Sequence, residues 1–130
     1  RLERITKTTW DVIAYLKQHP KVEKVIFPFD PDFPQYELAK KQMQGACGLL
    51  TIIVKAQDVL AVENFCNQLK HILMAVSWGG HESLIIPRCA ALPREKFNPQ
   101  FEEHRMLRLY VGLEDADYII KDLEQAFEKM

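Results

Sequence analysis

The sequence predicts a single α+β domain in which helices pack on one face of a small, largely antiparallel four-stranded sheet. Three observations predict this fold class. The chain has 130 residues, of which 48% are hydrophobic and 27% charged, as in ordinary globular domains with one core. Apolar residues recur at helical spacing in some segments and at strand spacing in others. Their order is helix, strand, helix, strand, helix, strand, loop, strand, helix, which favours two layers.

The first segment, residues 2–17, predicts an amphipathic helix. Its apolar positions fall on one helical face, and they are Leu2, Ile5, Val12, Ile13 and Leu16. The helix should end at His19-Pro20, because proline disfavours the helical conformation in the residue before it. Residues 22–27 then predict a short strand. The chain opens at Arg1, inside this helix, so we expect a fragment or a separated domain.

The middle of the chain predicts two further helices around a buried strand. Pro34 should open a short helix that extends to Met43. Residues 49–54 form a continuous apolar, β-branched run, which is typical of a strand covered on both faces. Asp58 should cap the next helix. The inward face of that helix is expected to comprise Val59, Val62, Cys66, Leu69 and Leu73, with Phe65 and Ile72 beside it.

Residues 74–84 predict a third strand that runs into a Ser-Trp-Gly-Gly corner. Gly79 and Gly80 allow the backbone to adopt positive φ and to approach a neighbouring group closely. Ser77 and Trp78 precede the turn, where a loop presents side chains to a ligand. The alternative is a strand end that turns a tight corner for backbone reasons alone.

Residues 106–112 show the clearest alternation and predict the last strand. Leu107, Leu109 and Val111 share one face, whereas Met106, Arg108 and Tyr110 share the other. Gly112 should end the strand. Asp115 should then cap a final helix whose inward residues are Ile119, Ile120, Leu123 and Phe127.

Arg108 is the most informative candidate for a binding residue. A guanidinium group is rarely buried unless it is paired, yet Arg108 lies between two apolar residues of a strand. Its planar set of donors suits a carboxylate bound through two hydrogen bonds. Alternatively, Arg108 faces solvent or pairs with an acid of its own domain. Tyr110, on the same face, either contacts a ligand or covers that face.

Several function classes are disfavoured by composition and spacing. Seventeen basic and 18 acidic residues give a net charge of −1, which argues against a nucleic-acid or anionic-membrane partner. No apolar run is long enough to cross a bilayer. Three cysteines without metal-ligand spacing predict reduced thiols in a cytosolic protein. His71 and His81 lack a third ligand at metal spacing, so we expect no metal site, and the residues alone indicate no self-sufficient active site.

Several short motifs are spread over the whole chain. Near the start are Arg1-Leu2-Glu3-Arg4 and His19-Pro20-Lys21-Val22, and residues 37–43 follow the proline-rich loop. Further on are the corner Ser77-Trp78-Gly79-Gly80 with Glu82-Ser83-Leu84-Ile85, and then Arg108-Leu109 with Val111-Gly112-Leu113-Glu114-Asp115. In this order the motifs resemble the pyridoxal-phosphate enzymes of cysteine and methionine metabolism, the transsulfuration family. The corner is similar to the family's Ser-x-Gly-Gly-x-Glu-Ser-Leu signature, and the last motif is similar to its closing strand and helix start.

The resemblance implies that residues 1–130 are the family's small C-terminal domain. Residues 1–19 would be the junction helix and residues 20–130 an α+β sandwich, as in fold-type I pyridoxal-phosphate enzymes. It further implies that Arg108 binds the substrate α-carboxylate with help from Ser77. Trp78 and Val76 would line the pocket for the substrate side chain. Trp78 resembles the residue at this position in bacterial cystathionine β-lyases, whereas Val76 and Tyr110 depart from the residues expected there. The resemblance therefore leaves β-lyase, γ-lyase and γ-synthase activities open.

The resemblance also implies what the 130 residues do not contain. The Schiff-base lysine and the cofactor-binding groups would belong to a large domain absent from this sequence, so this chain alone is expected to be inactive. The implied partners are pyridoxal 5′-phosphate on that large domain, an amino-acid thioether substrate and a homotetramer in the cytoplasm. A different class of function stays open, namely a non-catalytic amino-acid-binding or regulatory module.

Overall fold

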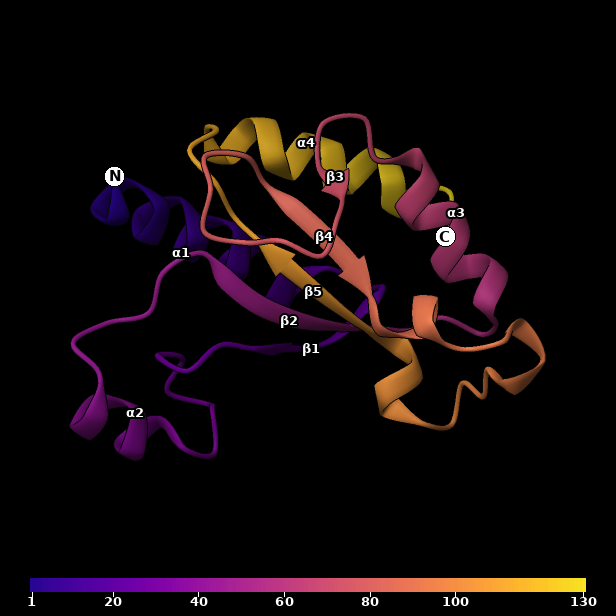
Figure 1. The fold of residues 1–130 in the computed structure, drawn as a ribbon, viewed down its shortest axis with the longest axis horizontal. Coiled ribbons are helices and arrows are strands. Elements are labelled where there is room, and N and C mark those ends of the chain that lie inside the picture. The colour runs from indigo at the N-terminus through magenta and orange to yellow at the C-terminus, as the bar shows by residue number, and fades with distance from the viewer.

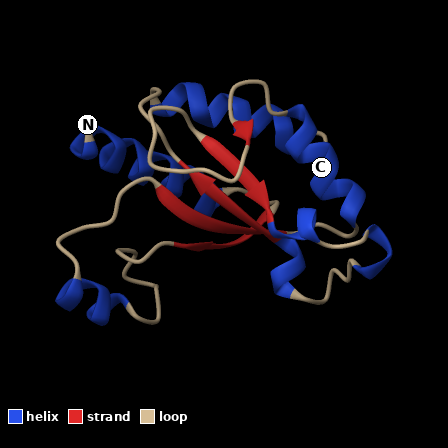
Figure 2. Ribbon diagram, viewed as in Figure 1, coloured by secondary structure: helices blue, strands red, loops and turns tan.

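A computed structural model describes all 130 residues of the chain. It contains four α-helices and five strands (Figures 1 and 2). In chain order the elements are α1 (Leu2–Gln18), β1 (Val22–Ile26), α2 (Tyr36–Gln42), β2 (Leu49–Val54), α3 (Val59–Gln68), β3 (Leu73–Met74), β4 (Leu84–Pro87), β5 (Met106–Tyr110) and α4 (Ala116–Phe127). Three short 3₁₀ turns, Arg88–Ala91, Arg94–Lys96 and Glu102–Arg105, occupy the segment between β4 and β5.

The strands form one sheet in the order β1-β2-β5-β4-β3. All pairs are antiparallel except β3 and β4, which are parallel. The α+β class is therefore confirmed, but the sheet has five strands instead of the four predicted. The additional strand arises because the segment before the corner and the segment after it both join the sheet, the first through only two residues.

The core lies between the sheet and the helices α1, α3 and α4. Leu107, Leu109 and Val111 are fully buried on the side of β5 that meets these helices, as the alternation predicted. α2 contributes little, since Ala39 is its only buried residue, and it projects away from the sheet at the lower left of Figure 1. Helices therefore cover one face, and the opposite face of β5 carries Arg108 and Tyr110.

Helix boundaries mostly follow the predicted local chemistry. α1 ends at Gln18, and the next residue, His19, is extended with ψ of 128° before Pro20. The Asp58 carboxylate accepts a hydrogen bond from the Ala61 amide at 2.8 Å, which confirms the cap of α3.

Two local predictions were wrong. Asp115 is the N-cap residue of α4, but its carboxylate makes no capping bond and instead accepts from Arg4 at 2.9 Å. Leu73 was expected on the inward face of α3, yet it is 57% exposed. The helix stops at Gln68, so Leu73 follows the alternation of a strand, and Ile72 is buried in its place.

Candidate functional site

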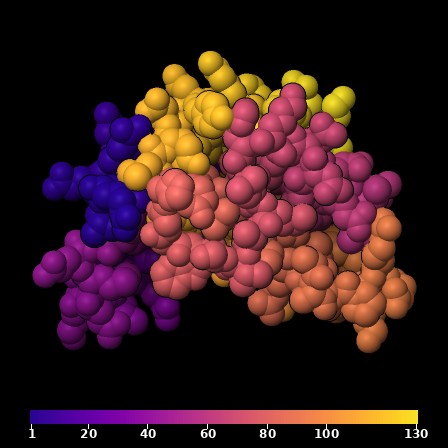
Figure 3. Space-filling view, turned by 45° about the horizontal axis from the view of Figure 1, so that its top comes forward, coloured from indigo at the N-terminus to yellow at the C-terminus, as the bar shows by residue number.

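The segment between β3 and β4, residues 75–83, lies against β5, and we call it the corner loop (Figure 1). Two residues of β5 on the face away from the helices hold it through their side chains. The Arg108 guanidinium donates a hydrogen bond to the Val76 carbonyl. The Tyr110 hydroxyl donates to the Gly80 carbonyl at 3.0 Å. In Figure 3 this stretch of chain occupies the centre of the molecular face, in pink.

A third anchor fixes the end of the corner loop through buried polar groups. The Ser83 hydroxyl oxygen accepts from the Gly112 amide at 2.9 Å and donates to Glu114 Oε2 at 2.8 Å. Glu114 Oε1 also accepts from the Ser83 amide at 2.8 Å. The Leu113 amide donates to the His81 carbonyl at 2.7 Å. The chain just after β5 is thus bonded to the corner loop on both sides of Glu82.

The two glycines of the corner have different roles. Gly79 has φ of +88°, a conformation that other residues adopt only at a cost, whereas Gly80 does not. A Cβ at Gly80 would lie 2.8 Å from a carboxylate oxygen of Glu82, which is a flexible side chain. The predicted positive φ is therefore confirmed for Gly79 alone.

Arg108 has no carboxylate partner within the chain. Of the six arginines, Arg4, Arg88, Arg94 and Arg105 each form an ion pair with an acidic side chain. Only the N-terminal Arg1 and Arg108 do not. This removes one of the alternatives for Arg108, namely that it pairs with an acid of its own domain.

Arg108 borders a cavity of about 360 Å³ on the face of the sheet opposite the helices. β5 is the central strand, and Arg108 is paired with Thr51 of β2 and with Ile86 of β4. The cavity is lined by these residues together with Pro87, Arg88, Ala90, Ala91 and Met106. The half-buried guanidinium therefore emerges from a rigid strand into open space lined by two arginines and no acidic side chain.

Tyr110 lies on the other side of the corner loop and is only 4% exposed. Its ring packs on Gly48, where an added Cβ would lie 2.9 Å from the ring. Burial raises the pKa of Tyr110, and the nearby Cys47 raises it further. The phenol therefore stays protonated and donates to the Gly80 carbonyl. Tyr110 borders a second cavity of about 290 Å³, which Trp78 and Gly79 also line.

The four predicted site residues are consequently placed around the corner but not around one cavity. Arg108 and Val76 are in direct contact. Ser77 is exposed and its hydroxyl makes no hydrogen bond within the chain. Trp78 is 60% exposed and lines the second cavity, not the cavity that Arg108 borders. The roles assigned to these residues stay predictions.

Ser83 and Glu114 were not singled out by the sequence, although both lie in segments that resemble the family motifs. Ser83 is 1% exposed. The available signals were a polar residue directly before an apolar strand and an acidic residue directly before a helix. Neither signal indicates that the two side chains meet, because they are 31 positions apart.

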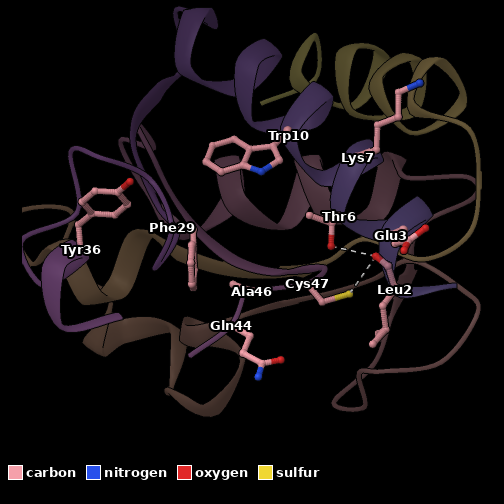
Figure 4. Close-up of a pocket in the computed structure, with 11 residues that line it drawn as sticks. Leu2, Glu3, Thr6, Lys7, Trp10, Phe29, Tyr36, Gln44, Ala46 and Cys47 are labelled. Carbon is pink, nitrogen blue, oxygen red and sulfur yellow. Dashed lines mark hydrogen bonds between the residues drawn. The ribbon is translucent and has the colours of Figure 1, made fainter. Parts of the chain in front are cut away.

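A further cavity, of about 1040 Å³, lies between α1 and residues 29–47 (Figure 4). Trp10, Phe29 and Tyr36 contribute aromatic rings to its lining. Near its floor, the Leu2 carbonyl accepts from the Thr6 hydroxyl at 2.8 Å, and the Cys47 thiol lies 3.9 Å from the same oxygen.

The remaining groups in the chain indicate no other reactive centre. Cys66 and Cys89 are buried free thiols, and burial raises the pKa of Cys66 to about 12, so its thiolate is scarce at neutral pH. No cluster of three or more histidine, cysteine or acidic side chains has the proximity needed to hold a metal ion. No helix combines the length and the apolarity required to cross a membrane.

A comparison with known protein families identifies the class of this chain. The model of the family "Cys/Met metabolism PLP-dependent enzyme" matches residues 1–128. The chain belongs to this family, whose cofactor is pyridoxal 5′-phosphate.

Individual relatives are gamma-lyases by name. The chain is 35% identical to a cystathionine gamma-lyase of Dictyostelium discoideum, over 99% of this chain and 34% of the relative. It is 37% identical to an L-methionine gamma-lyase of Treponema denticola, over 100% of this chain and 33% of the relative. It is 35% identical to human cystathionine gamma-lyase, over 98% and 32% respectively. The chain thus spans about a third of the length of these relatives.

The residues around Arg108 do not by themselves fit pyridoxal phosphate. A Schiff base needs a lysine amine, and no lysine lines the cavity at Arg108 or the cavity at Tyr110. No aromatic ring lines the Arg108 cavity to stack on the cofactor. The cationic, acid-free lining fits a carboxylate instead.

Proposed function

We propose that this chain is the substrate-binding domain of a pyridoxal-phosphate-dependent carbon–sulfur lyase, and that Arg108 binds the α-carboxylate of an amino-acid thioether. One observation carries the proposal. Arg108 extends from the central strand into a cavity lined by no acid, and no carboxylate within the chain neutralises it. A half-buried guanidinium without an internal counter-ion is suited to an anionic ligand.

The donor count leaves room for that ligand. A guanidinium group has five N–H donors, and Arg108 uses one of its terminal nitrogens for the Val76 carbonyl. The remaining donors suffice for a bidentate bond to a carboxylate. Because Arg108 sits on β5, flanked by paired strands on both sides, the substrate would be held at a fixed distance and orientation. Ser77 would assist, since its hydroxyl is exposed and free beside this contact.

The cofactor would be held outside these 130 residues. Pyridoxal phosphate supplies an electron sink that stabilises negative charge at the substrate Cα. In our proposal a large domain of the same enzyme provides the Schiff-base lysine, and the enzyme assembles as a cytoplasmic homotetramer. The 130-residue chain alone should therefore stay colourless when mixed with pyridoxal phosphate and dialysed. Retention of the yellow chromophore would contradict the proposal that the cofactor is held outside these 130 residues.

The carboxylate role is tested by Arg108→Ala and Arg108→Lys in the complete polypeptide that carries this chain. A charge-assisted bidentate bond of about 1.5–3 kcal/mol predicts a loss of kcat/KM of roughly 10- to 100-fold. Lysine retains the charge but not the planar pair of donors, so it should restore activity only partly. Arg94→Ala is the matched control, because Arg94 pairs with Glu63 at the surface. If kcat/KM of Arg108→Ala equals that of the control, the carboxylate role is wrong.

The bond that is cleaved needs a separate experiment. Trp78 suggested cystathionine β-lyase, whereas the relatives named above are γ-lyases. With cystathionine as substrate, β-elimination yields homocysteine, pyruvate and ammonia, whereas γ-elimination yields cysteine, 2-oxobutanoate and ammonia. Identification of the keto acid assigns the reaction. Absence of both keto acids, with the cofactor bound, would contradict a lyase and leave a γ-synthase or an amino-acid-binding module.

A further inference from the structure

We propose that Tyr110 is a positioning residue that holds the corner loop in register with Arg108 and thereby influences which amino-acid side chain is accepted. The inference rests on the proposed function, because it treats Ser77 and Trp78 as the substrate-facing part of the loop. It adds the hydrogen bond from Tyr110 to Gly80, which the proposed function does not use. Three features of the structure support it.

The first feature is the spacing of the anchors along the corner loop. Arg108 holds the loop at Val76 and Tyr110 holds it at Gly80. Residues 77–79, between these points, make no hydrogen bond to the rest of the chain. The position of the Trp78 side chain therefore depends on the two flanking anchors.

The second feature is that one of the anchors is shared with the proposed substrate. A carboxylate that binds Arg108 would share the five donors of the guanidinium with the Val76 carbonyl. The Tyr110 hydroxyl is not part of the proposed carboxylate site, and its side chain is buried. The bond from Tyr110 to Gly80 is therefore the anchor that does not involve the proposed ligand-binding group.

The third feature is the rigidity of Tyr110 itself. Its ring lies against Gly48, whose missing side chain makes room for it. The Gly48 carbonyl accepts from the Val111 amide at 2.8 Å, which fixes this glycine to the chain just beyond β5. Tyr110 also shares the cavity of about 290 Å³ with Trp78. The rigid Tyr110 ring thus supports the backbone beside Trp78 and lines the same cavity as Trp78.

Tyr110→Phe in the complete polypeptide tests the proposal, because phenylalanine keeps the packed ring and removes only the bond to Gly80. The ratio of kcat/KM for cystathionine to kcat/KM for L-methionine should change by roughly 2- to 10-fold, the range expected of one hydrogen bond, chiefly through KM. Tyr118→Phe is the matched control. Tyr118 also donates or accepts through its hydroxyl, to His71 Nδ1 at 2.7 Å, but it lies on α4.

A second readout does not depend on catalysis. The 130-residue chain has two tryptophans, so in this chain by itself Trp10→Phe leaves Trp78 as the only one. In that background, Tyr110→Phe should increase the acrylamide quenching of Trp78 fluorescence and lower its anisotropy, whereas Tyr118→Phe should change neither. A purely structural role of Tyr110 would lower the unfolding midpoint without changing the substrate ratio or the quenching.

The outcomes separate the inference from the proposed function. If Arg108→Ala is neutral, the proposed function fails. If Arg108→Ala is impaired, while Tyr110→Phe matches Tyr118→Phe in substrate ratio and in Trp78 quenching, the positioning role is overturned and the carboxylate role stands. A changed ratio together with increased quenching supports the positioning role.

Discussion

The Ser83 hydroxyl and the Glu114 carboxylate are 2.8 Å apart, and this contact joins the end of the corner loop to the start of α4. Glu114 also accepts from the Ser83 amide, and the Ser83 oxygen in turn accepts from the Gly112 amide. A single buried serine therefore takes part in all three of these hydrogen bonds. The pair fixes the corner loop with respect to β5, which carries Arg108.

We expect Ser83→Ala to lower the free energy of unfolding by about 1–3 kcal/mol, because it leaves the Gly112 amide buried without an acceptor. Glu114→Gln should cost less, since one amide oxygen still accepts a bond. A double-mutant cycle, measured by urea unfolding, should give a coupling of about 0.5–3 kcal/mol between the two sites. Strict additivity would contradict a direct bond in solution.

Gly48 should tolerate no side chain, whereas Gly45 should tolerate one. A Cβ at Gly48 would lie 2.2 Å from the Val111 carbonyl oxygen, which is backbone and has little freedom to move. We expect Gly48→Ala to cost about 1–3 kcal/mol of stability from overpacking. A Cβ at Gly45 would have no neighbouring atom within 4 Å, so Gly45→Ala should be neutral or stabilising by up to about 1 kcal/mol. Equal effects of the two substitutions on the urea midpoint would refute the close packing of Gly48.

Asp122 should stabilise the turn after α3 in its ionised form. It is 2% exposed and accepts from the amides of Lys70, His71 and Ile72, each at 2.9 Å. Burial alone would raise the pKa of Asp122, but these three amides and Gln125 together hold it below 3.8. Its contribution is therefore present above pH 3.8 and is lost as the pH falls through the lowered pKa.

Asp122→Asn should consequently destabilise the fold at neutral pH by about 1–3 kcal/mol, because an amide NH₂ would face backbone donors. Glu128→Gln, at the exposed end of α4, is the control. Urea unfolding at pH 7 provides the comparison. Indistinguishable urea midpoints for the two variants would show that the Asp122 carboxylate does not stabilise the fold through these three amides.

His19 should make the fold less stable as the pH falls. Its ring stacks on Phe127 with centroids 4.1 Å apart, and Nδ1 accepts from the Lys21 amide at 3.1 Å. Burial, and then the charge of Lys21, lower the pKa of His19 below 6.5. As the pH falls, His19 therefore binds a proton in the unfolded chain before it does so in the folded chain. The contribution of neutral His19 to the free energy of unfolding is complete above pH 6.5 and declines as the pH falls through the lowered pKa.

An NMR titration of the imidazole resonances gives the direct measurement. His19 should titrate below pH 6.5, and His19→Gln should weaken the pH dependence of the urea midpoint. His81→Gln is the control, because the His81 side chain is 83% exposed. A His19 pKa at or above 6.5 would contradict the burial argument.

Local chemistry made many of the elements predictable from the amino-acid sequence. The stop at His19-Pro20, the cap by Asp58 and the buried face of β5 depend on neighbouring residues or on short-range alternation, so the sequence indicates them directly. The fifth strand, β4, was missed because its four residues, Leu84–Pro87, form a continuous apolar run that shows no period.

The candidate site was predictable in its residue types but not in its arrangement. Arg108 was noticeable because a guanidinium interrupts an apolar strand. Arg108 has no acidic partner because of where the fold places the 18 acidic side chains of the chain. No local pattern in the sequence specifies those positions. Likewise, Trp78 is adjacent to Ser77 in the chain but borders a different cavity from Arg108.

The sequence by itself determined the α+β class, most element boundaries and the family, because these follow from periodicity, capping chemistry and short motifs. Only the tertiary structure decided that the corner loop lies against β5 and is bonded there at Val76, Gly80 and Ser83. The physical reason is that each of these bonds joins groups about 30 positions apart, so it forms only after the sheet has brought β4 beside β5.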